Sequence, residues 1–202
     1  MKTISLLMLA LILASAGTDT SLSKKEIKFS TKYIDTSMSL AISAVENLSP
    51  KQWNYRPNDE AWTIAEICEH MLIAEKGILG RIQNQIVTDE ANRQLADGEG
   101  ITNEELILRI KDRSPDKRVK TGEQFEPSGI LKTPQDFIKQ YSAARKATQE
   151  YLKTTDVDLT AYYGKSPLGL VSAYQWTLIM SAHAERHTGQ IVEVQSSANY
   201  PK

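Results

Sequence analysis

The chain has 202 residues, of which 41% are hydrophobic and 24% charged, a composition typical of one globular domain rather than a disordered segment. The 24 Lys and Arg residues nearly balance the 25 Asp and Glu residues, so the basic surface of a nucleic-acid-binding protein is not indicated. The one cysteine, Cys68, excludes an internal disulfide and any metal site built from several cysteines.

Residues 1–16 have the layout of a secretory signal peptide. Lys2 gives a positive start, Leu6–Leu13 form an apolar run, and Ala14-Ser15-Ala16 resembles a cleavage site. The run is shorter than the ~20 residues that span a bilayer as a helix. We therefore expect cleavage and export to the periplasm or medium, with residues 17–202 as the mature domain and no stable membrane insertion. Retention of the segment as a membrane anchor is the alternative.

Four segments with helical periodicity follow. In the first, apolar residues recur mostly in steps of three and four from Ile27 to Leu48, which predicts a helix over residues 23–48. In the second, the capping-box pattern Thr63-Ile64-Ala65-Glu66 opens a helix that runs to about Ile86.

The third segment begins at Thr133-Pro134 and carries an apolar stripe to Leu152. The fourth begins with the capping box Ser172-Ala173-Tyr174-Gln175 and continues to about Val194. Between the second and third segments, Val87–Lys132 forms a long connection, in which the capping pattern at Thr102 predicts one short helix.

No segment shows the alternation of a strand. The sequence therefore predicts an all-α fold, a four-helix bundle with a long crossover connection that carries a short extra helix. Such a connection permits the order of helices around the bundle to differ from their order in the sequence.

The three histidines fall on the predicted inward faces of two helices. His183 and His187 are four residues apart within the apolar stripe of the fourth helix, so their side chains lie on one face. His70 lies on the flank of the inward face of the second helix. An imidazole in a core is costly unless its nitrogens find partners, and neutral imidazoles are good ligands for first-row divalent metals. We therefore predict a metal site of His70, His183 and His187, with hydrogen-bonded core histidines as the alternative.

At this point two segments resemble a known family. The segment Trp62–His70 and the segment His183–Ile191 are similar to the second-helix and fourth-helix motifs of the DinB/YfiT-like superfamily, and Gly169–Trp176 resembles its usual lead-in. The resemblance covers residues 25 to 195. It implies a four-helix bundle with a divalent metal held by His70, His183 and His187. Members are described as metal-dependent hydrolases, and some resemble thiol S-transferases. This chain differs from the common pattern in carrying an export signal.

Three neutral ligands leave a coordination position open, as in catalytic rather than structural sites. A bound water there has a lowered pKa, and a substrate thiol is ionised in the same way. Glu66 and Gln190, each one turn from a predicted ligand, are weak candidates for catalytic roles. Glu66 is more readily interpreted as the capping-box residue, and Gln190 as a hydrogen-bonding neighbour of the site.

Other residues near the predicted ligands receive structural interpretations. Cys68 is expected to be a small buried hydrophobe that does not ligate with His70, and Glu69 and Glu75 are expected to be solvated. Aromatic residues before the second helix either wall the mouth of the site or pack on the end of the bundle: Trp53, Tyr55 and Trp62.

The sequence thus favours an exported, metal-dependent hydrolase or transferase that acts on a small molecule. The expected cofactor is a divalent ion such as zinc, nickel, iron or manganese. The alternatives are a non-catalytic metal-binding protein and a helical interaction module. No nucleic acid is expected as a partner, and the family resemblance is compatible with a homodimer.

Overall fold

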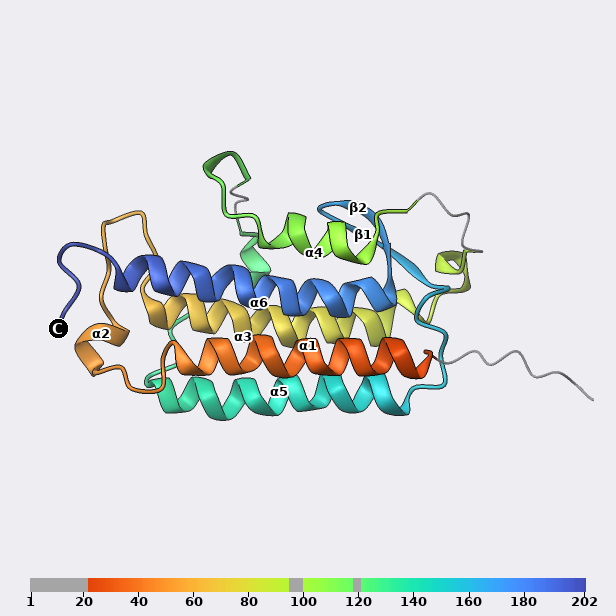
Figure 1. Ribbon diagram of the computed structural model, residues 1–202, viewed down its shortest axis with the longest axis horizontal. Coiled ribbons are helices and arrows are strands. Elements are labelled where there is room, and N and C mark those ends of the chain that lie inside the picture. The colour runs from red at the N-terminus through yellow and green to blue at the C-terminus, as the bar shows by residue number, and fades with distance from the viewer. Residues whose placement is uncertain (1–21, 95–99, 118–120) are drawn as a thin grey trace, which may run out of the picture.

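The computed structural model describes residues 22–94, 100–117 and 121–202. The predicted signal peptide, residues 1–16, lies outside them. Four long helices lie side by side: α1 (Lys24–Ser43), α3 (Ile64–Arg81), α5 (Pro134–Thr154) and α6 (Ala173–Gln195) (Figure 1). The predicted four-helix bundle is confirmed.

The bundle does not follow the order of the sequence. α1 and α3 each contact both α5 and α6, so α1 and α3 occupy diagonal corners. α1 and α6 run in one direction along the bundle, and α3 and α5 run in the other (Figure 1). Because α3 and α5 are parallel neighbours, the chain between them must return along the length of the bundle, which is the predicted crossover.

The crossover contains the expected short helix and some smaller turns. α3 continues into a π-helical turn, η1 (Ile82–Ile86), and a 3₁₀ turn follows at η2 (Glu90–Asn92). The short helix is α4 (Asn103–Lys111), which packs along α6 on the outside of the bundle (Figure 1). Two further 3₁₀ turns, η3 (Pro115–Lys117) and η4 (Glu123–Phe125), precede α5.

Each long helix begins at a hydroxyl side chain that caps it. Thr63 accepts a hydrogen bond from the backbone N–H of Glu66, and the Glu66 carboxylate accepts one from the Thr63 N–H, so the predicted capping box is present. The same reciprocal pair starts α1, α5 and α6. α1 ends at Ser43, earlier than predicted, and a short helix, α2 (Pro50–Trp53), follows before α3.

A β-hairpin that the sequence analysis did not predict leads into α6. Its strands, β1 (Tyr163–Ser166) and β2 (Gly169–Ser172), are antiparallel, with Ser166 paired to Gly169 across a two-residue turn. Gly169 has a φ of 100°, a conformation that glycine adopts without the steric penalty of a Cβ. Strands of four residues are too short to show alternation, and this is why the prediction of no strands is wrong here.

The core consists of two hydrophobic clusters along the bundle. The cluster nearer the hairpin contains Ile34, Ile78, Leu152 and Met180, among others. The other contains Ala41, Leu72, Tyr141 and Ala184, among others. The histidines lie beside residues of the second cluster: His70 is next to Met71 on α3, and Ala184 lies between His183 and His187 on α6.

A buried polar network lies where the two clusters meet. Arg145 of α5 donates Nη1 to Glu75 Oε2 of α3 at 2.9 Å, and neither side chain is more than 2% exposed. The Arg145 Nη2 donates to the hydroxyls of Ser37 on α1 and Ser181 on α6. Thr148 donates to Glu75 Oε1 at 2.7 Å. The network joins all four long helices, and the expectation that Glu75 is solvated is wrong.

Among the described residues, none of the helices combines the length and the hydrophobicity that crossing a bilayer requires.

Candidate metal centre

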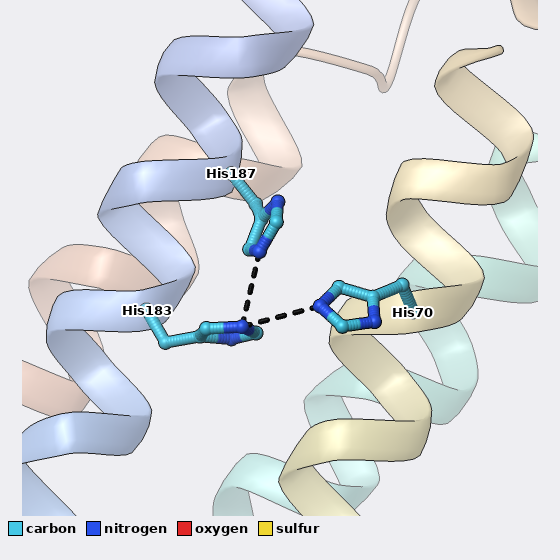
Figure 2. A group of neighbouring side chains, drawn as sticks. All are labelled: His70, His183 and His187. Carbon is cyan, nitrogen blue, oxygen red and sulfur yellow. Dashed lines mark hydrogen bonds between the residues drawn. The ribbon is translucent and has the colours of Figure 1, made fainter. Parts of the chain in front are cut away.

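The three histidines meet between α3 and α6. His70 lies in the second turn of α3, directly after the capped start of that helix, and His183 and His187 lie on the face of α6 that packs against α3. Figure 2 shows their rings turned toward one another across the gap between the two helices. His70 and His187 are buried and His183 is half-buried.

The Nε2 atoms of the three rings converge on one point. His183 Nε2 lies 3.2 Å from His70 Nε2 and 3.0 Å from His187 Nε2, the two contacts drawn as dashed lines in Figure 2. One ligand atom from each of the three side chains lies within 4.8 Å of the others. The structure therefore brings together all three residues predicted as ligands.

The other ring nitrogens of two histidines are held by oxygen atoms. His70 Nδ1 lies 2.9 Å from the backbone carbonyl of Phe125, and His187 Nδ1 lies 2.8 Å from Gln190 Oε1. Because a carbonyl oxygen only accepts, each Nδ1 carries the proton and each Nε2 presents a lone pair. Gln190 therefore orients His187, the role of an outer neighbour of the site that the sequence suggested.

Burial keeps the three rings uncharged. Desolvation is the largest influence on each, and it lowers the pKa of His187 to about 3 and the pKa of His183 well below its usual range. The pKa of His70 is also lowered by burial, against the opposing effect of its bond to Phe125. At physiological pH the three imidazoles are therefore neutral, which is the form that binds metals.

This donor set fits a divalent cation. His183 Nε2 is within hydrogen-bonding distance of both other Nε2 atoms, so in the metal-free cluster a proton on it can join the rings, and a cation would take the place of that proton. Ligand nitrogens about 2.0–2.1 Å from a tetrahedral zinc ion are about 3.3 Å apart. The observed separations of 3.0 and 3.2 Å are close to that value. His70, His183 and His187 are the residues that would hold the ion.

The acidic residues near His70 are engaged away from the centre. Glu66 completes the cap of α3 and forms an ion pair with Arg56 at 2.6 Å, which agrees with its structural interpretation. Glu75 belongs to the buried network with Arg145. Glu69 is 1% exposed, so the expectation that it is solvated is wrong.

The carboxylate of Glu69 accepts hydrogen bonds from the segment that precedes α5. The donors are the backbone N–H groups of Ser128, Gly129, Ile130 and Leu131 and the Ser128 hydroxyl. Burial alone raises the pKa of Glu69, but these hydrogen bonds outweigh burial and lower it. The helical periodicity of apolar residues in α3 did not indicate this contact.

Cys68 and the aromatic residues have structural surroundings. Cys68 is fully buried in the second hydrophobic cluster and is not part of the histidine group. Trp53 is fully buried in the same cluster, which fits packing on the end of the bundle. Trp62 is half-buried, and its ring lies 5.1 Å from the His70 ring between centroids, so this aromatic residue does border the site.

The crossover is tied to α6 beside the histidines. Arg186 donates to the backbone carbonyls of Asp112 and Lys117. Arg113 donates to both carboxylate oxygens of Glu193 and to the carbonyl of Arg186. These bonds hold the residues after α4 against the helix that carries two of the three candidate ligands.

Comparisons with known proteins agree with this arrangement. Residues 33–191 match the family model described as the DinB superfamily. A solved structure, YfiT from Bacillus subtilis, superposes with a TM-score of 0.57 at 14% identity, over 90% of this chain and 92% of that one. YfiT is described as "a probable metal-dependent hydrolase with an unusual four-helix bundle topology". At this identity the likeness shows the fold. No curated protein sequence matches the chain.

Proposed function

This chain belongs to the DinB superfamily, and from that premise we propose that it is a metal-dependent enzyme of the hydrolase or transferase type. One divalent ion, such as zinc, nickel, iron or manganese, is held by His70, His183 and His187. The observation that carries the proposal is the convergence of the Nε2 atoms of three neutral imidazole rings. In two of these rings, His70 and His187, the Nδ1 atom faces an oxygen acceptor. The description of YfiT as a probable metal-dependent hydrolase supports the same assignment.

The chemistry of the site follows from its neutral ligands. An ion bound by three imidazoles supplies a Lewis acid that polarises an electrophile or lowers the pKa of a water or thiol. The chain itself orients two of the rings through Phe125 and Gln190 and keeps all three uncharged by burial. Glu66 and Glu69 accept hydrogen bonds from other partners, so the proposal assigns neither carboxylate the role of proton acceptor at this centre.

Two further parts of the proposal rest on the sequence. Residues 1–16 act as a signal peptide, so the enzyme works in the periplasm or outside the cell. We further propose a small-molecule substrate, and nucleic acid is not expected as a partner because acidic and basic residues nearly balance. Mass spectrometry of the protein recovered from its native source tests the export, since an N-terminus at or after residue 17 is expected.

Metal analysis tests the centre itself. The protein is purified without a histidine tag, loaded with zinc and desalted, and its metal content is measured. One ion per chain is expected, and His183→Ala should abolish binding. Cys68→Ala is the matched control, because Cys68 is buried on α3 two residues before His70 and is not part of the histidine group. Absence of stoichiometric metal from the unmodified chain contradicts the proposal.

Activity tests the enzymatic part. Panels of ester, amide and thiol-transfer substrates are assayed with the metal-loaded protein, the chelated protein and His183→Ala. Turnover should require the metal and should be lost in the variant. Turnover that persists after complete metal removal contradicts a metal-dependent mechanism, and metal binding without turnover of any substrate favours the non-catalytic alternative.

A further inference from the structure

The buried carboxylate of Glu69 organises the segment that precedes α5. Its Oε1 accepts from the Ser128 N–H at 2.6 Å and from the Ser128 hydroxyl at 3.0 Å. Its Oε2 accepts from the N–H groups of Gly129, Ile130 and Leu131 at 3.0, 2.9 and 3.4 Å. Four successive backbone donors therefore point at one side chain, an arrangement that favours an anion.

Gly129 permits this wrapping. Its φ of 80° lies in the left-handed region, and an added Cβ would meet no atom within 4 Å. The glycine is thus needed for its backbone conformation and not for space. The turn at Gly129 directs the neighbouring N–H groups at Glu69.

The same segment reaches the metal centre a few residues earlier. The backbone carbonyl of Phe125 accepts the Nδ1 proton of His70 at 2.9 Å. The Phe125 ring lies against α3 at Gly77, where an added Cβ would come within 3.1 Å of the ring. Glu69 and His70 are adjacent on α3. One turn of α3 therefore contacts both ends of the segment 125–131, through His70 at Phe125 and through Glu69 at residues 128–131.

We propose that Glu69 is a positioning residue for the metal centre, which it serves by holding the segment 125–131 in place and with it the carbonyl that orients His70. This inference rests on the proposed metal-binding function. Without the carboxylate, the backbone N–H groups of residues 128–131 lose the acceptor they share, and because residues 128–130 are exposed, these groups turn to water and the segment moves. The Phe125 carbonyl then leaves His70, and the Nδ1–H tautomer of that ring is no longer enforced.

Glu69→Gln tests this. Glutamine has the size of glutamate, but its amide nitrogen cannot accept from a backbone N–H. Loss of an outer partner of a metal ligand weakens metal affinity by about 10–100-fold, and that is the expected change in the zinc Kd. The cobalt-substituted protein should also show an altered visible spectrum, which reports the ligand field rather than stability.

Glu75→Gln is the matched control for stability. Glu75 is also a buried glutamate on α3, but its partners are Arg145 and Thr148 in the network. This variant should lose stability and keep a zinc Kd close to that of the unmodified chain. Gly129→Ala is a second test of the same segment, because it strains the backbone there without filling occupied space, and it should weaken zinc binding in the same direction as Glu69→Gln.

The tautomer of His70 is read in the metal-free protein by ¹⁵N NMR, which separates this inference from the proposed function. The unmodified chain should hold the proton on Nδ1, and folded Glu69→Gln or Gly129→Ala should show a mixture of tautomers. If either folded variant keeps the tautomer and a zinc Kd within about threefold of the original, the positioning role is wrong. If the unmodified chain binds no metal but the variants still release His70, the hold on the ring stands and the proposed metal function fails.

Discussion

Replacing Glu75 with glutamine should destabilise the bundle severely, because the ion pair with Arg145 is almost fully buried. The two side chains are 2% and 0% exposed, and the Arg145 guanidinium also donates to Ser37, Ser181 and the carbonyl of Ile34. Glu75→Gln removes the negative charge and leaves the guanidinium in the core without its counter-ion. The three other acceptors are neutral, and all three accept from Nη2 rather than from the Nη1 that faces Glu75.

The magnitude follows from the kind of contact that is lost. Breaking a buried ion pair by removing one partner costs about 3–5 kcal/mol. The glutamine oxygen can still accept one hydrogen bond, so we expect the lower end, about 3 kcal/mol. For a domain of this size each kcal/mol shifts the Tm by about 2–4 °C, which gives a decrease of about 6–12 °C. Arg145→Met should be at least as costly, because it strands the carboxylate instead.

Urea denaturation followed by circular dichroism measures the effect, with chelator present so that metal binding adds nothing to stability. The double variant Glu75→Leu with Arg145→Met removes both charges, and it should lose less free energy of unfolding than the single variants Glu75→Leu and Arg145→Met added together. A loss below about 1 kcal/mol in Glu75→Gln, with an unchanged dependence on urea, would refute the reasoning from buried charge.

Two further predictions concern acid and the helix cap. The metal-free protein should lose stability as the pH falls from about 6.5 toward 3, because the unfolded chain takes up protons at His187 that the folded chain, with a pKa of about 3 there, does not. The slope is up to about 1.4 kcal/mol per pH unit for each such histidine, and denaturation at several pH values should show a shallower slope in His187→Asn. Thr63→Ala should lower the free energy of unfolding by about 1 kcal/mol through loss of the α3 cap, and an unchanged urea midpoint would contradict this.

The parts of the fold that repeat along a helix could be predicted from the sequence. The apolar stripes and the capping patterns at Thr63 and Ser172 indicated the long helices, and the spacing of His183 and His187 placed two imidazoles on one face. These features depend on residues three or four positions apart, which is the range that helical periodicity reports.

What could not be predicted depends on contacts between distant segments. Glu69 and Glu75 lie off the apolar stripe of α3, yet both are buried, because the segment before α5 covers one and Arg145 faces the other. A signal for Glu75 was present in the sequence. Arg145 follows Tyr141 by one turn within the stripe of α5, and an arginine in that position needs a buried carboxylate. No comparable signal exists for Glu69, whose partners are backbone groups.

The wide separation of the histidines along the chain determines when an ion can be captured. His70 and His183 are 113 residues apart, and the second of them lies on α6, which is synthesised well after α3. A growing chain that has not yet reached α6 therefore offers only one imidazole, and chelation by all three waits until α6 has docked against α3. Under the proposed function, an ion bound there would link two segments that are distant in the sequence, and it could bind only after α3 and α6 have packed together.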